Sequence, residues 1–89
     1  MTPLRSSRDV LAFVEELIDY LRSERVPELV DRLARTKRYI AVSYAEYYNE
    51  VELALKAVLS HRRKVLSAER EDEVLQTISQ IDETFRSRG

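Results

Sequence analysis

From Glu28 to Arg88 the chain contains neither glycine nor proline, the residues that most often end a helix. The rest of the composition is also helical, with abundant leucine, glutamate, arginine and alanine. With 44% hydrophobic and 35% charged residues, the 89-residue chain has enough apolar surface for one domain with a modest core. The sequence therefore predicts a single all-α domain and argues against intrinsic disorder.

Three helices are expected, at about 7–24, 27–66 and 68–86. Ser6 or Ser7 can cap the first helix by accepting a backbone N–H of its first turn. Pro27 disfavours helical geometry at the preceding residue but suits the first position of a new helix. Ser67, followed by an acidic turn, is the best candidate for the start of the third helix.

The middle helix is too long for a compact monomer if it is straight. At 1.5 Å per residue, residues 27–66 would span roughly 60 Å, whereas a domain of this size has a radius of gyration near 13 Å. The helix therefore either breaks near residues 36–43 or projects and needs a partner. We expect a short, a long central and a medium helix in an antiparallel helical bundle with coiled-coil-like packing, completed by dimerisation.

The best-defined apolar face runs along the second half of this helix. Successive steps of about 100° place its members within an arc roughly 140° wide. Four of the five tyrosines fall within ten residues there, and tyrosine is enriched at interface hot spots. This face is therefore the predicted protein interface, formed by Ile40, Tyr44, Tyr47, Tyr48, Val51, Leu55 and Val58.

Two basic groups flank the tyrosines. Positive patches beside aromatic side chains can hold a phosphate backbone and stack bases. The net charge of −1 and nearby Glu46 and Glu50 weigh against this second interpretation, a nucleic-acid accessory protein. Its contact residues would be Arg32, Arg35, Arg38, Arg62, Arg63 and Lys64.

No catalytic, cofactor or metal site is predicted. The chain has no cysteine and a single histidine, His61, so one copy cannot supply a catalytic triad or a histidine-rich metal site. Carboxylates at helical spacing, such as Glu46 and Glu50, are interpreted as a solvated face. A third interpretation stays open, namely an all-helical enzyme with a charged site between protomers.

The leading interpretation is a small non-catalytic protein interaction module, such as an adaptor, an inhibitor, an assembly chaperone or a phage-type accessory factor. Its expected partners are a second copy of the chain, forming a homodimer, and an unidentified protein. No apolar run approaches the roughly 20 residues of a membrane span, and the N-terminus lacks a hydrophobic signal core. A cytoplasmic protein without membrane contact is therefore expected.

Overall fold

The computed structural model describes residues 6–86, and every regular element in this range is helical. The all-α prediction is confirmed. The elements are α1 (Ser7–Ser23), α2 (Pro27–Arg35), the 3₁₀ helix η1 (Thr36–Ala41), α3 (Tyr44–Leu59), α4 (Ala68–Gln80) and the π-helical turn η2 (Ile81–Arg86). Because η1 continues α2 and η2 continues α4, the described chain forms four helical rods.

The expected number of three helices is wrong, because the long central helix is divided in two. Between η1 and α3, Ser43 is extended, with φ −167° and ψ 131°, and its hydroxyl caps α3 by accepting the N–H of Glu46. The second of the two helices, α3, ends at Leu59. Dividing the rod lets its two halves fold onto each other, which a straight helix of that length does not allow.

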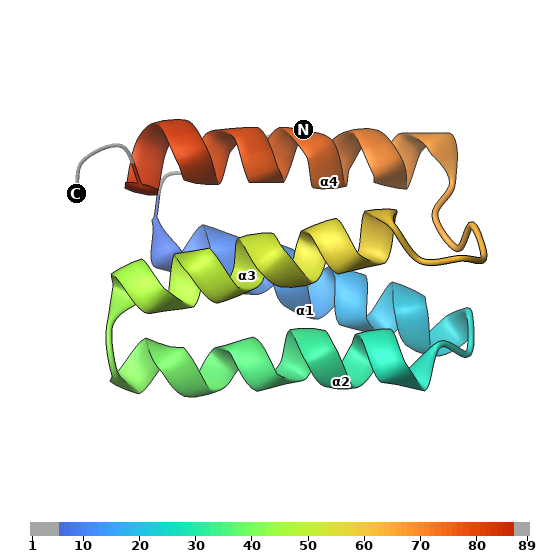
Figure 1. The fold of residues 1–89 in the computed structure, drawn as a ribbon, viewed down its shortest axis with the longest axis horizontal. Coiled ribbons are helices and arrows are strands. Elements are labelled where there is room, and N and C mark those ends of the chain that lie inside the picture. The colour runs from blue at the N-terminus through green and yellow to red at the C-terminus, as the bar shows by residue number, and fades with distance from the viewer. Residues whose placement is uncertain (1–5, 87–89) are drawn as a thin grey trace.

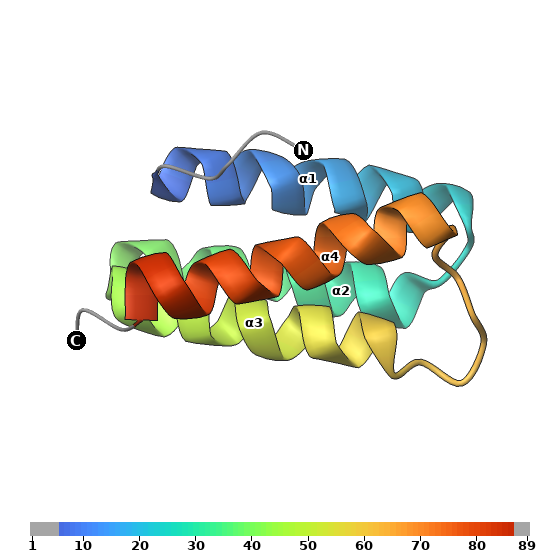
Figure 2. The same cartoon turned by 90° about the horizontal axis from the view of Figure 1, so that it is seen from above.

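Consecutive helices run in opposite directions along the long axis of the molecule (Figure 1). The pair α1 and α3 occupies the middle, with α2 on one side and α4 on the other. Seen from above, α4 lies over the space between α1 and α3 (Figure 2). The principal extents are 34, 25 and 20 Å and the radius of gyration is 12.2 Å.

The apolar core draws on all four rods. In α1 the buried residues recur at helical spacing, from Val10 to Leu21. In α3 they run from Tyr47, one turn after the start of the helix, to Val58. The loop before α4 adds Val65 and Leu66, and η2 adds Ile81. Each amphipathic face is thus buried against other helices of the same chain.

Candidate interaction surfaces

The structure places most of the predicted tyrosine-rich interface inside the core of one chain. Tyr44 is exposed, and Ile40 packs against the core while remaining partly accessible. Because the chain turns at Ser43, α3 packs against the other helices of the same chain. These helices cover the apolar face that a straight helix would have left exposed. Five of the seven interface candidates are buried in this way: Tyr47, Tyr48, Val51, Leu55 and Val58.

Tyr47 is the largest fully buried side chain of the described residues. Its hydroxyl has no hydrogen-bond partner among them. Burial, reinforced by Tyr48 and by the carboxylate of Glu15, raises the pKa of Tyr47 to about 12. Glu15 itself forms an ion pair of 3.0 Å with Lys37, which links α1 to η1. Tyr47 therefore serves packing between helices and is not available to a partner.

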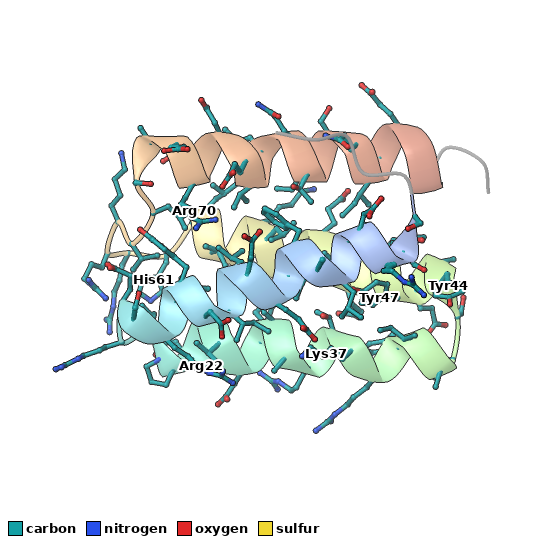
Figure 3. All side chains as sticks on the ribbon, turned by 180° about the vertical axis from the view of Figure 1, so that it is seen from behind. Arg22, Lys37, Tyr44, Tyr47, His61 and Arg70 are labelled. Atoms are coloured by element: carbon teal, nitrogen blue, oxygen red, sulfur yellow. The ribbon has the colours of Figure 1, made fainter. Side chains whose placement is uncertain are left out.

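Three tyrosine rings form a row from solvent into the core at the start of α3. The ring of Tyr44 stacks on that of Tyr48, with centroids 6.3 Å apart and planes inclined by 22°. The rings of Tyr48 and Tyr47 follow at 5.6 Å. Figure 3 shows Tyr44 at the end of the molecule, with Tyr47 further along α3. The outer ring of this row is therefore the part of the tyrosine cluster that a second molecule can reach.

Beside Tyr44 the chain exposes further apolar atoms. Val42 is 69% exposed and Tyr44 is 54% exposed, the two highest values among the large hydrophobic residues described. Ala41 and Ala45 are also exposed. We call these four residues, Ala41, Val42, Tyr44 and Ala45, the apolar corner. It lies where η1 turns into α3, at the same end of the molecule as the start of α1 (Figure 1).

Three arginines of the first predicted basic group lie on the exposed side of α2 and η1. We call Arg32, Arg35 and Arg38 the arginine strip. Arg32 and Arg35 line a hollow of about 160 Å³ that Tyr39 and Glu50 also line. Arg35 and Arg38 line a second, more open hollow. Within residues 6–86 none of the three forms an ion pair, so their charges face solvent.

Two of the three members of the second basic group, Arg63 and Lys64, make side-chain contacts within the chain. Arg63 donates from its guanidinium to the carbonyl oxygen of Glu24 at 2.7 Å. Lys64 lies 3.8 Å from Glu71. His61 approaches Glu28 at 3.0 Å. A hydrogen bond to its own backbone, then the hydrogen bond with His61 and the nearby charge of Arg62, lower the pKa of Glu28. The Arg63 and His61 contacts fasten the loop before α4 to the end of α1 and to the first turn of α2.

The structure does not bring the two basic groups together into one surface. The loop after α3 lies beside the beginning of α2, at Glu28. Arg38 is ten residues further along the rod formed by α2 and η1, a rise of about 15 Å. The rod runs away from that loop (Figure 1). Only the arginine strip therefore keeps the features of a candidate polyanion surface.

A pairing between Tyr20 and Arg70 is a contact that the sequence did not indicate. The Tyr20 hydroxyl donates to the carbonyl oxygen of Val65 at 2.9 Å. The guanidinium of Arg70 lies 5.2 Å from the centre of the Tyr20 ring and also bonds Glu73 at 3.2 Å. Helical spacing places Arg70 in the first turn of α4, but it contains no information about a partner fifty residues away.

Glu52 is a buried carboxylate of α3, with 3% of its surface exposed. Lys56, one turn further along the same helix, bonds its Oε2 at 3.2 Å. Charged residues four positions apart on a helix commonly pair in this way. The contact is internal to α3, and it gives no indication of a site for a substrate.

Neither a metal centre nor a membrane span is visible in the part of the chain that the structure describes. No group of three or more histidine, cysteine, aspartate or glutamate side chains there is placed to hold a metal ion. No helix between residues 6 and 86 combines the length and hydrophobicity needed to cross a bilayer. Comparisons with protein-family models, with curated proteins and with solved structures found no match to this chain.

Proposed function

We propose that the chain is a small non-catalytic helical interaction module that self-associates as a homodimer and binds another protein. Its role would be that of an adaptor, an inhibitor, an assembly chaperone or a phage-type accessory factor. The supporting observation is the apolar corner, where Val42 and Tyr44 are more than half exposed. Dimerisation through this corner would join the antiparallel helices of two copies.

The apolar corner has the properties of a binding hot spot. Tyrosine supplies a large contact area at low conformational cost, and stacking on Tyr48 already restricts the ring of Tyr44. A partner that covers the ring therefore has little side-chain entropy to overcome. Val42 and the two exposed alanines extend the apolar area around it.

Light scattering after size-exclusion chromatography tests self-association. We expect a dimer at concentrations of roughly 10 to 100 µM and a shift to monomer when Val42→Ser and Tyr44→Ser are combined. Leu75→Ser is the matched control, because Leu75 is an exposed apolar side chain of α4. A wild-type chain that stays monomeric throughout this range would remove the homodimer from the proposal.

Photo-crosslinking in the host cell tests the second partner. A photoreactive amino acid replaces Tyr44 in one variant and Leu75 in the other. We expect a protein adduct of defined mass from position 44 and none of that mass from position 75. If position 44 yields only the cross-linked homodimer, the chain binds itself and the wider interaction role fails.

A second candidate function is nucleic-acid binding by the arginine strip, favoured by three arginines that make no ion pair within residues 6–86. Three phosphate contacts predict that affinity falls about 40-fold between 50 and 200 mM salt. Replacing Arg32, Arg35 and Arg38 with alanine should abolish that binding, whereas Arg62→Ala should preserve it. Absence of binding to DNA and RNA at low salt would exclude this candidate.

A further inference from the structure

The turn between η1 and α3 depends on one residue. Val42 has φ −96° and ψ −57°, within the helical region. Ser43 is extended, and the next residue already belongs to α3. A change in the two backbone angles of Ser43 would therefore join residues 27–59 into one continuous helix.

Local structure does little to hold this turn closed. Residues 28–59 contain no glycine or proline that would disfavour a continuous helix. The 3₁₀ segment η1 is six residues long, whereas such runs rarely exceed three or four residues and often mark a hinge. The capping bond from Glu46 N to the Ser43 hydroxyl is long, at 3.5 Å. The closed form therefore depends on contacts between helices.

We propose that two copies of the chain exchange halves by straightening at Ser43. In the exchanged dimer residues 27–59 form one helix about 50 Å long, which exceeds the 34 Å length of the closed molecule. The α1 and α2 half of each copy then packs on the α3 and α4 half of the other. This inference rests on the proposed self-association and specifies how it occurs.

Exchange preserves the contacts that stabilise the closed chain. The His61 contact with Glu28 and the Arg63 contact with the Glu24 carbonyl join the two halves, so both re-form between copies. Identical contacts make such an exchange a low-cost route to a dimer. The apolar corner would lie at the middle of the two long helices, where contact between copies can bury Val42 and Tyr44. The dimer thus gains burial that the monomer lacks.

Tyr44→Pro separates exchange from a simple surface contact. In the closed chain residue 44 is the first residue of α3, a position that proline favours, and Ser43 before it is already extended, as proline requires. In the exchanged dimer the same proline would lie inside a continuous helix and break it. Tyr44→Ala removes the same ring without that constraint and is the matched control.

The readout is the dimer dissociation constant from light scattering over a concentration series. Exchange predicts that Tyr44→Pro weakens the dimer at least about 100-fold relative to Tyr44→Ala. Equal dissociation constants for the two variants would overturn exchange and leave self-association through the surface intact. A wild-type monomer at every concentration would overturn both.

Spin-label distances give a second test that does not depend on the folding of a proline variant. The chain has no cysteine, so Asp31→Cys and Ser60→Cys provide two unique labelling sites, both exposed in the structure. Mixing the labelled chain with an excess of unlabelled chain leaves most dimers with one labelled copy. The measured distance then joins the two labels within that copy. Exchange predicts a distance near 40 Å in the dimer and a short distance in the monomer. A dimer fraction with only the short distance would refute the proposal.

Discussion

His61 Nε2 lies 3.0 Å from Glu28 Oε1, although 33 positions separate the two residues in sequence. A second contact runs in parallel, from Arg63 to the carbonyl oxygen of Glu24. Together they tie the loop before α4 to the end of α1 and to the first turn of α2. Arg63, which the sequence assigned to a candidate polyanion surface, thus helps to connect the α1 and α2 half of the molecule with the α3 and α4 half.

Glu28→Gln should reduce stability at neutral pH and have a smaller effect in acid. The folded-state pKa of Glu28 is lowered from its ordinary value of 4.5, so its contribution is present above pH 4.5 and is lost as pH falls through the lowered pKa. The urea midpoints of wild type and variant, measured at neutral pH and at successive steps below pH 4.5, should converge as the carboxylate is protonated. A constant difference would contradict the assignment.

Tyr47→Phe should maintain or increase stability at pH 7. The buried hydroxyl has no hydrogen-bond partner among the described residues, and leaving such a group unsatisfied costs about 1 to 3 kcal/mol. Phenylalanine fills nearly the same volume without that cost. Urea unfolding should show an unchanged or higher free energy of unfolding. A clear loss would mean that the hydroxyl does make a stabilising hydrogen bond.

The same substitution should reduce sensitivity to alkali. The folded-state pKa of Tyr47 is about 12 against an ordinary 10.0, so the unfolded chain releases the proton first and stability falls between pH 10 and 12. Two pH units correspond to about 3 kcal/mol at most. Unfolding followed by circular dichroism should begin at higher pH in Tyr47→Phe than in wild type. Similar onset in both would contradict the burial of this hydroxyl.

Arg25→Gly should stabilise the chain. Arg25 has φ 59°, the left-handed region that costs a non-glycine residue about 1 kcal/mol. The bonds from Val26 N to Leu21 O and from Arg25 N to Arg22 O form a Schellman motif, in which glycine is the preferred residue. Glycine also raises the conformational entropy of the unfolded chain, which offsets part of this gain. The free energy of unfolding should therefore rise by a net amount of about 0.5 kcal/mol.

Arg22→Gly is the control for that prediction. Arg22 is also an exposed arginine, but it lies in the last turn of α1, where glycine should destabilise the helix by up to about 1 kcal/mol. Thermal unfolding of the two variants should therefore shift in opposite directions. A loss of stability in both would show that the backbone at Arg25 is not left-handed in solution.

Tyr20 and Arg70 should be coupled through the aromatic ring and not through the hydroxyl. In a double-mutant cycle, Tyr20→Leu combined with Arg70→Ala should give a coupling of about 0.5 to 1 kcal/mol. Tyr20→Phe keeps the ring and loses the bond to Val65, so it should cost about 1 kcal/mol without coupling to Arg70. Chemical denaturation provides all four free energies. Zero coupling for the leucine cycle would argue against the cation–π contact.

Local sequence signals agree with the structure wherever neighbouring residues decide the outcome. Ser6 caps α1 and Ser67 caps α4, each hydroxyl accepting a backbone N–H three residues later. Pro27 occupies the first turn of α2. These features depend on atoms within one helical turn, so the order of residues determines them.

Tertiary contacts determine which residues form the candidate surfaces, and helical periodicity gives no information about these contacts. An apolar arc identifies a side that must be buried, but it does not say whether the same chain or a second copy buries it. For Tyr47 and Val51 the covering helices belong to the same chain, whereas Tyr44 on the same arc stays exposed. Arg63 and Arg38 look alike in sequence, yet Arg63 bonds Glu24 and Arg38 faces solvent.

The sequence by itself determined that this chain is helical, where its caps lie and which sides of its helices are apolar, because propensity, capping and periodicity act over one or two turns. The tertiary structure decided that the long segment breaks, at Ser43, and does not project, and hence which tyrosines are buried and which arginines form no ion pair within residues 6–86. The reason is that a one-residue bend costs little locally, while the helix faces that it brings together contribute most of the burial energy.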